Sequence, residues 1–289
     1  MGPFKSFRRG KNYFRNMKLE EFVKQYEHIL DSKGIINPLY FVAKLISEIE
    51  AINLSNILME KNFNISENTL NKLKKIVLDD YPLEYITNRV EFYGYDFYVD
   101  ERVLIPRVET EDLIKIAIDI INEKKYKYIM DIGTGSGVIP IVLKKEFPYL
   151  KVFGIDISKD ALEVAKLNAK KHGVNIEFIN SDIFENVPKN ILDKIEFIIS
   201  NPPYVETAFF ESSTSLKYEP KIALEAGTDG QDFFYNLSVK FAEILQSRHF
   251  LFETTEFNID KTISILSKFG KCKIYKDAYN VNRFIEKHI

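Results

Sequence analysis

The sequence of 289 residues contains one cysteine, Cys272, and no tryptophan. A single cysteine excludes an internal disulfide and a cysteine-based zinc cluster, and it fits a reducing compartment such as the cytoplasm, which we expect as the location. The alternating run Lys271-Cys272-Lys273-Ile274-Tyr275 predicts that this cysteine is a small buried strand residue. The four histidines are scattered without metal-ligand spacing, so the sequence predicts no metal site.

The sequence also lacks a surplus of charge of either sign. It carries 40 Lys+Arg against 42 Asp+Glu, for a net charge of −2. Proteins that hold duplex DNA by its phosphates usually show a basic surplus, so the balance favours a protein or small-molecule partner over nucleic acid. The first 18 residues are the exception, with six basic side chains and no acid. That segment fits either an RNA-binding arm or a frayed or misassigned start.

Long apolar runs, proline and glycine are all scarce. No run approaches the roughly 18–20 apolar residues that span a bilayer, and no apolar core follows the basic start as in a signal peptide. Ten prolines, 12 glycines and a hydrophobic content of 45%, including 23 Phe and 16 Tyr, argue against disorder. The sequence therefore predicts a globular protein with a sizeable core and no membrane partner.

The first part of the chain has helical periodicity. Apolar residues recur at three- and four-residue steps in three segments: Leu19–Leu30, Pro38–Leu54 and Glu67–Leu78. We expect a small helical domain over residues 1–84. Tyr85–Val99 is rich in Tyr, Phe, Ile and Val around Gly94, which predicts a β-hairpin within a linker over residues 85–105.

Residues 106–289 alternate between strand and helix patterns, which is typical of a doubly wound, mostly parallel sheet. Two strand patterns at the end are joined by a polar turn and predict an antiparallel hairpin that closes the sheet. The fold class is therefore α/β, with a Rossmann-like seven-stranded sheet. The predicted strands are Tyr128–Asp131, Lys151–Asp156, Ile176–Asn180, Ile195–Ser200, His249–Thr254, Lys271–Asp277 and Asn282–His288.

A glycine-rich turn follows the first of these strands, in Asp131-Ile132-Gly133-Thr134-Gly135-Ser136-Gly137. Glycine has no Cβ, so the backbone of such a turn can pass close to a ligand. The dinucleotide fingerprint G-x-G-x-x-G needs glycine at position 138, where this chain has valine. The spacing G-x-G-x-G behind an acid instead resembles motif I of the Rossmann-like methyltransferases, which use S-adenosyl-L-methionine.

Two further acids end the next two strands. Asp156 lies about 20 residues past the turn, where a carboxylate can accept both ribose hydroxyls. Asp182 ends the third strand, and in methyltransferases of this type that position reaches the adenine amine while the next residue, Ile183, packs by the ring. We therefore predict that S-adenosyl-L-methionine is bound by Gly133–Gly137 (Gly133, Thr134, Gly135, Ser136, Gly137), Asp156, Asp182 and Ile183.

The fourth strand leads into Asn201-Pro202-Pro203-Tyr204. Two prolines have no N–H and a fixed φ, so the loop leaves the sheet stiffly and the Pro202 carbonyl is free to face the site. A planar NH2 group is a poor nucleophile because its lone pair is delocalised. Two acceptors, Asn201 Oδ1 and the Pro202 carbonyl, can fix its hydrogens and aim the nitrogen at a methyl group, while Tyr204 contacts the planar target. We predict Asn201, Pro202 and Tyr204 as catalytic, and all four residues as substrate-binding.

With these loops, the chain resembles the HemK/PrmC family, which methylates the glutamine of the Gly-Gly-Gln motif in peptide chain release factors. The resemblance covers nearly everything after Leu78. Its other motifs are Tyr85-Ile86, Glu91-Phe92-Tyr93-Gly94, Pro106-Arg107-Val108-Glu109-Thr110-Glu111, Tyr218-Glu219-Pro220, Ala223-Leu224, Gly227-Thr228-Asp229-Gly230 and Asn282-Arg283-Phe284.

The resemblance implies methyl transfer from S-adenosyl-L-methionine to that glutamine's amide nitrogen. It also implies that Asn201 and Leu104 lie along the cofactor and that the helical domain recognises the acceptor protein. The chain departs from the family at four backbone-shaping positions, which puts the loop geometry in question and not the chemistry. These are Val108 for proline, Asn88 for glycine, Glu84 for glutamine and Thr255 for glycine.

Three other interpretations stay open. A sister enzyme that methylates a glutamine of a ribosomal protein shares the same loop and a helical N-terminal region. Enzymes that methylate the exocyclic amine of adenine in DNA use the same tetrapeptide, but they usually carry a large target-recognition segment, and here only Val205–Asp229 separates the loop from the next helix. The third is a catalytically dead binding scaffold, which the two intact loops argue against.

Overall fold

The computed structural model describes residues 17–60 and 63–288, so the basic residues before Met17 lie outside the described part. The chain divides into two compact units, the first ending at Thr87 and the second beginning at Asn88.

The first unit is helical, with a hydrophobic core of its own that includes Phe22, Leu30, Ile46 and Leu73. Its elements are β1 (Met17–Lys18), α1 (Leu19–Ser32), α2 (Pro38–Glu50), α3 (Leu54–Met59), β2 (Asn64–Ile65), α4 (Glu67–Asp79) and α5 (Leu83–Thr87).

The long second helix expected over Pro38–Leu54 is in fact two helices. The first ends where Ala51 adopts a left-handed φ of 53°, and Asn53 caps the next by accepting from the Ser55 amide at 2.9 Å. The predicted N-terminal features of α2 and α4 are present. Pro38 is the first residue of α2, and the Ser66 hydroxyl caps α4 by accepting from the Thr69 amide at 3.2 Å.

The predicted hairpin over Tyr85–Val99 is shorter in the structure. Tyr85–Thr87 belongs to helix α5, and pairing is confined to β3 (Val90–Phe92) and β4 (Tyr95–Phe97). Tyr93 and Gly94 both have positive φ in the tight turn between the strands. Asn88, where the family has glycine, also has a positive φ of 52°, a conformation that asparagine tolerates better than most residues.

The second unit, within residues 88–288, is built on a seven-stranded sheet of order β10-β11-β9-β8-β5-β6-β7. Strands β9, β8, β5, β6 and β7 are parallel, and β11 and β10 close the edge as an antiparallel hairpin. The predicted α/β fold is therefore confirmed. The strands are β5 (Tyr128–Ile132), β6 (Lys151–Asp156), β7 (Glu177–Asn180), β8 (Phe197–Ser200), β9 (His249–Glu253), β10 (Cys272–Lys276) and β11 (Asn282–Lys287).

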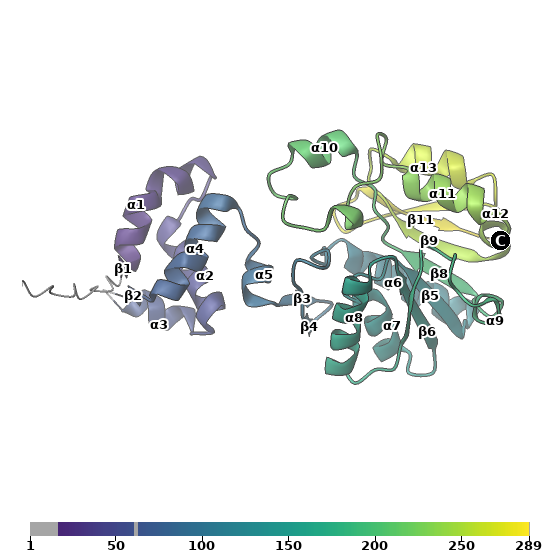
Figure 1. Ribbon diagram of the computed structural model, residues 1–289, viewed down its shortest axis with the longest axis horizontal. Helices are drawn as coiled ribbons and strands as arrows, with labels where there is room; N and C mark the ends of the chain where they lie inside the picture. Colours follow the sequence, from purple (N-terminus) through teal and green to yellow (C-terminus); the bar gives the residue numbers. More distant parts are fainter. Residues whose placement is uncertain (1–16, 61–62, 289) are drawn as a thin grey trace, which may run out of the picture. The chain divides into compact units, whose positions relative to one another are not determined.

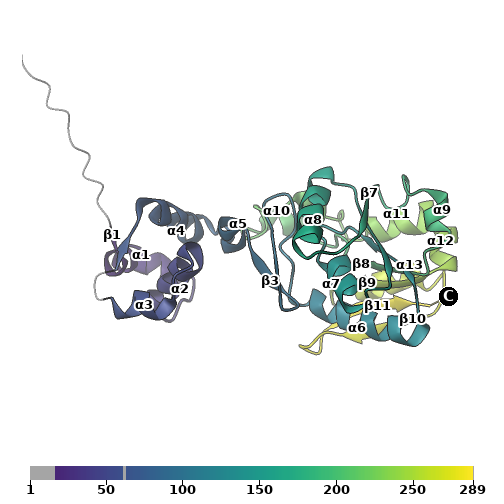
Figure 2. The ribbon, with the colours of Figure 1, turned by 90° about the horizontal axis from the view of Figure 1, so that it is seen from below.

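Helices cover both faces of this sheet (Figures 1 and 2). Alternate strand residues point to opposite layers: Phe197 and Ile199 pack under α6, α7 and α8, whereas Ile198 packs on the side of α11, α12 and α13. The helices of the second unit are α6 (Thr110–Lys124), α7 (Val138–Glu146), α8 (Lys159–Lys171), α9 (Lys189–Leu192), α10 (Thr207–Ser212), the 3₁₀ turn η1 (Lys221–Ala223), α11 (Asp232–Lys240), α12 (Ala242–Ser247) and α13 (Ile259–Leu266).

Two details differ from expectation. Cys272 lies in a strand, as predicted, but it is only half-buried because β10 is an edge strand with a neighbour on one side alone. The third core strand ends at Asn180, so Asp182 stands two residues beyond it.

Among the described residues, no helix combines the length and the apolar character that crossing a membrane needs.

Candidate active site

A cavity of about 220 Å³ opens at the carboxyl ends of β5, β6, β7 and β8. Parallel sheets place ligands at this edge because the loops that follow the strands converge there. Of the residues predicted from the sequence, the cavity is lined by Leu104, Gly133, Gly135, Asp156, Asp182, Ile183, Asn201, Pro202 and Pro203.

The glycine turn leaves open backbone on the cavity side. Gly133 and Gly135 have φ of +69° and +52°, and a Cβ at Gly135 would have no atom within 4 Å. Gly137 has a different constraint, since a Cβ there would lie 3.1 Å from that of Ala165 in α8. Thr134, Ser136 and Gly137 do not line the cavity and are buried. They shape the turn, and their contact with the cofactor stays a prediction.

Asp156 connects the turn to the following helix. Its carboxylate accepts from the Gly135 amide at 2.9 Å and from the Ser158 amide at 2.9 Å. Burial raises the pKa of Asp156, an effect that these backbone hydrogen bonds oppose. The carboxylate thus shapes the glycine turn in addition to facing the cavity.

Asp131, the acid before the turn, is buried, and neither of its carboxyl oxygens has a hydrogen-bond partner among the described residues. Burial raises the pKa of Asp131 to about 8. Asp131 does not itself line the cavity.

The third-strand loop is strained at the cavity wall. Ile183 has a positive φ of 47°, an unusual conformation for a β-branched residue. Its neighbour Asp182 lies 3.8 Å from the ammonium of Lys240 on α11. The backbone therefore turns sharply where the sequence predicts that the adenine ring is bound.

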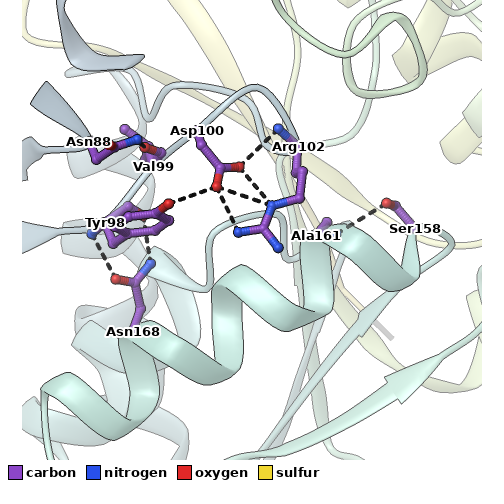
Figure 3. Close-up of polar contacts among 8 residues, drawn as sticks. All are labelled: Asn88, Tyr98, Val99, Asp100, Arg102, Ser158, Ala161 and Asn168. Carbon is purple, nitrogen blue, oxygen red and sulfur yellow. Dashed lines mark hydrogen bonds and ion pairs between the residues drawn. The ribbon is translucent and has the colours of Figure 1, made fainter. Parts of the chain in front are cut away.

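The segment after β4 forms another wall, and a buried asparagine fixes it (Figure 3). Asn168 on α8 accepts from the Tyr98 amide at 2.7 Å and donates to the Tyr98 carbonyl and the Ser136 carbonyl, both at 2.9 Å. Asp100 accepts from the Arg102 side chain and, at 2.9 Å, from the Tyr98 hydroxyl. These contacts join the wall that contains Arg102 and Leu104 to the glycine turn.

The Asn201–Tyr204 loop leaves β8 beside the cavity, and three hydrogen bonds hold it. The Asn201 amide nitrogen donates to the Thr110 hydroxyl at 3.0 Å, and the Tyr204 hydroxyl donates to Glu253 at 3.1 Å. The amide of Asn258 donates to the Tyr204 carbonyl at 3.1 Å. Burial and the adjacent Glu253 raise the pKa of Tyr204 well above its usual value, so its hydroxyl keeps its proton.

A second, smaller cavity of about 30 Å³ adjoins the first. Tyr204 lines this one and not the larger cavity, and Arg107 and Val205 line it as well. Asn201 and Pro202 line both cavities, together with Leu104 and Ala223. The structure therefore puts these two residues at the junction of a large and a small compartment.

Sequence reasoning missed several residues of this site. Arg102, Ile222, Phe233 and Asn236 also line the larger cavity, and no local motif marks the last three. Glu253 ends a parallel strand, as Asp156 does, so its position was a usable signal.

One cluster away from the cavity was also missed. His249 on β9 and Glu286 on β11 lie 2.8 Å apart, and His288 lies 3.3 Å from the same carboxylate. Strand pairing thus gathers a group of potential metal ligands that the sequence spacing hid, all within 4.8 Å of one another. Each is engaged in hydrogen bonds or ion pairs, and the expected absence of a metal stays a prediction.

The site fits S-adenosyl-L-methionine on its own geometry. Gly133 and Gly135 offer a bare backbone to the cavity, Asp156 faces it with a carboxylate, and Ile183 and Leu104 add apolar walls. When bound, this cofactor supplies an electrophilic methyl group on a sulfonium.

Comparison with known proteins identifies the chain. Residues 114–217 match the model of the Methyltransferase small domain family. The release factor glutamine methyltransferase of Fusobacterium nucleatum is 32% identical over 285 residues, covering 95% of this chain and 80% of that protein. The enzyme of the same name from Flavobacterium psychrophilum is 31% identical over 278 residues, covering 92% of this chain and 96% of that protein.

A solved structure with the same fold is the hMettl16 catalytic domain in complex with a MAT2A 3′UTR hairpin, at a TM-score of 0.54 and 14% identity, covering 68% of this chain and 76% of that one. These matches confirm the predicted family, the methyltransferase class and the cofactor, S-adenosyl-L-methionine. The chain belongs to the family of release factor glutamine methyltransferases.

Proposed function

We propose that this enzyme transfers the methyl group of S-adenosyl-L-methionine to the side-chain amide nitrogen of the glutamine in the Gly-Gly-Gln motif of peptide chain release factors. The observation that carries the proposal is the junction of the two cavities. Asn201 and Pro202 line both the large compartment, which fits the cofactor, and the small one, where we place the target amide. The names of the relatives support release factors as acceptors.

In this mechanism the chain positions the nucleophile. Asn201 Oδ1 and the Pro202 carbonyl accept the two hydrogens of the glutamine NH2, so that its nitrogen faces the larger cavity. Tyr204, fixed by its hydrogen bond to Glu253, contacts the planar amide in the smaller cavity. No strong base is needed, because the methylated nitrogen is cationic and readily loses its proton.

We further propose that the first unit serves the acceptor protein and not the cofactor. Every predicted cofactor residue lies in the second unit, and the described part of the first unit forms a self-contained helical core. The expected setting is the cytoplasm, where release factors act. Nucleic acid is not expected as a substrate, in keeping with the net charge of −2.

The test is labelled methyl transfer from S-adenosyl-L-methionine to three purified acceptors in parallel: a release factor, ribosomal proteins and duplex DNA. We expect labelling of the release factor, lost when its Gly-Gly-Gln glutamine is replaced by alanine. Labelling of a ribosomal protein alone would move the assignment to the sister enzyme. Labelling of DNA alone would assign an adenine methyltransferase.

A further inference from the structure

A chain of hydrogen bonds runs behind the Asn201–Tyr204 loop. The Thr110 hydroxyl, at the first residue of α6, donates to Glu253 Oε2 at 2.8 Å. The same hydroxyl oxygen accepts from Asn201 Nδ2 at 3.0 Å, and the other oxygen of Glu253 accepts from the Tyr204 hydroxyl at 3.1 Å. Thr110 and Glu253 are buried, with 2% and 1% exposure, so water does not compete for these contacts.

The chemistry of the four side chains gives each of these hydrogen bonds a direction. An ionised carboxylate only accepts, so the Thr110 hydroxyl donates its single hydrogen to Glu253. Toward Asn201, the Thr110 hydroxyl oxygen can then only accept a hydrogen bond. The amide of Asn201 must therefore turn its NH2 group, and not its oxygen, toward Thr110. Were Asn201 flipped, its Oδ1 would face an oxygen that has no proton to give, at 3.0 Å.

We propose that Thr110 and Glu253 are positioning residues, which lock the amide of Asn201 with its oxygen toward the acceptor and anchor Tyr204 through the same carboxylate. This inference rests on the proposed function, since it gives Asn201 Oδ1 the task of accepting a hydrogen from the target NH2. A flipped Asn201 would point its own NH2 group at the NH2 group of the target, so that two hydrogen-bond donors would face each other. A single buried carboxylate thus sets both side chains that flank the target.

The test compares Thr110→Val, which has nearly the same shape without the hydroxyl, with Thr110→Ser, which keeps it. Thr262→Val is the matched control, because Thr262 is also buried and its hydroxyl donates to the side chain of Gln231 at 2.9 Å and to the Asn258 carbonyl at 3.1 Å, but not to Asn201, Tyr204 or Glu253. Each variant of the full chain is assayed for single-turnover methylation of a release factor, for affinity toward S-adenosylhomocysteine, and for melting temperature.

We expect Thr110→Val to lower the single-turnover rate by about tenfold to a hundredfold, the range that misplacement of a reacting group produces, with cofactor affinity nearly unchanged. Thr110→Ser should recover most of the rate, and Thr262→Val should lower the melting temperature at a wild-type rate. A wild-type rate in Thr110→Val, or equal losses in the Val and Ser variants, overturns the proposal.

A readout that needs no acceptor separates this inference from the proposed function. In ¹⁵N-labelled enzyme, the side-chain amide proton of Asn201 that is donated to Thr110 should exchange with solvent slowly in the wild type and Thr110→Ser, and faster in Thr110→Val. If the wild type fails to methylate release factors, the proposed function fails, yet slow exchange still supports the lock. Equal exchange in all three proteins overturns the lock, whatever the substrate is.

Discussion

At the scale of single residues, Asp156 has two tasks. Its carboxylate holds the glycine turn through the Gly135 amide and the start of α8 through the Ser158 amide, and it also lines the larger cavity. Asp156→Ala removes charge-assisted hydrogen bonds worth about 1.5–3 kcal/mol, so we expect cofactor affinity to fall about tenfold to a hundredfold. Calorimetry with S-adenosylhomocysteine measures it.

The matched control is Asp160→Ala, an exposed acid in the first turn of α8 that does not line the cavity. It should leave affinity unchanged. The rate of the bound Asp156→Ala complex should fall far less than its affinity, because the role we predict for this carboxylate is to hold the ribose and not the reacting methyl. Unchanged affinity in Asp156→Ala would give the second-strand acid another role.

Two substitutions of Asn201 distinguish a catalytic from a structural role for this residue. Asn201→Ala removes the acceptor for the target NH2 and should be nearly inactive. Asn201→Asp keeps an acceptor but adds a negative charge beside the cationic cofactor, which stabilises the ground state more than the charge-dispersed transition state, so we expect a small residual activity. Thermal melts and single-turnover transfer measure both effects. A lowered melting point with a wild-type rate in the bound complex contradicts the catalytic role.

The raised pKa of Glu253 predicts that the methylation rate depends on pH. Burial raises its pKa to about 7; hydrogen bonds from Thr110 and Tyr204 and the charge of Arg283 on β11 oppose this, and Glu109 before α6 adds to it. Only the ionised form fixes the hydrogen-bond order at Asn201. We therefore expect the single-turnover rate to rise with pH through about 7, and this acid limb to be absent in Glu253→Gln.

The raised pKa has the opposite effect on stability. A carboxyl that holds its proton more tightly in the folded state contributes stability fully below its unfolded pKa of about 4.5, and loses that contribution as pH rises through about 7. Ionised Glu253 is thus a cost in stability at the pH where it positions the loop, a compromise that is common at active sites. Persistence of the acid limb in Glu253→Gln would assign the limb to another group.

At the scale of elements, the glycine turn joins two different requirements. Gly135 has open space where a Cβ would stand and lines the cavity, whereas Gly137 lies against Ala165 and lets α7 and α8 approach closely. One glycine thus leaves backbone open to the cavity and the other allows close helix packing, although the two are only two residues apart. The sequence motif alone does not distinguish these roles.

The pairing of β9 with β11 predicts an acid-sensitive contact. Burial by itself raises the pKa of Glu286, but hydrogen bonds from His249 and Tyr275 and the charges of His288 and His249 outweigh it and lower that pKa to about 2. The folded pKa lies below the unfolded value of about 4.5. The stabilisation is therefore complete above about pH 4.5 and is lost as pH falls toward about 2.

Denaturant titrations at pH 6 and at pH 3 measure this contact in the wild type and in Glu286→Gln. We expect the stability gap between the two proteins, roughly 2–3 kcal/mol at pH 6, to shrink at pH 3. Glu123→Gln is the control, since that carboxylate is exposed and paired with a neighbouring lysine. A gap that is the same at both pH values would show that Glu286 contributes through packing and not through charge.

At the scale of the whole molecule, the two units predict a division of labour. Deleting residues 1–87 should leave the affinity for S-adenosylhomocysteine nearly intact, because the residues that line the cavity lie between positions 102 and 236. Methylation of a folded release factor should fall more than methylation of a short Gly-Gly-Gln peptide. Parallel rate measurements on both substrates check this.

A deletion of residues 1–16 alone is the control, since it leaves the described helical core of the first unit in place. Equal losses on the protein and the peptide would contradict a docking role for the first unit. The same comparison tests the basic segment, whose structure lies outside the described residues.

The sequence determined the local features of this protein. Period-two and period-3.6 patterns, with glycine, proline and serine at the ends, placed the strands of the seven-stranded sheet within two residues and the glycine turn and Asn201–Tyr204 at strand ends. Such features are local because the energies that set them act between residues close in the chain. The departures, at α5 and at the break after Glu50, occur where short segments have weak intrinsic preferences.

Only the tertiary structure decided which side chains meet. Thr110 contacts Glu253 across 143 positions and Asn201 across 91, and His249 reaches Glu286 across 37. These pairs depend on how α6, β8, β9 and β11 pack side by side. No sequence period encodes that arrangement, because it is set by the summed burial of many apolar residues in the sheet. The sequence therefore determined the glycine turn and the Asn201–Tyr204 loop, and packing decided how Asn201 is held.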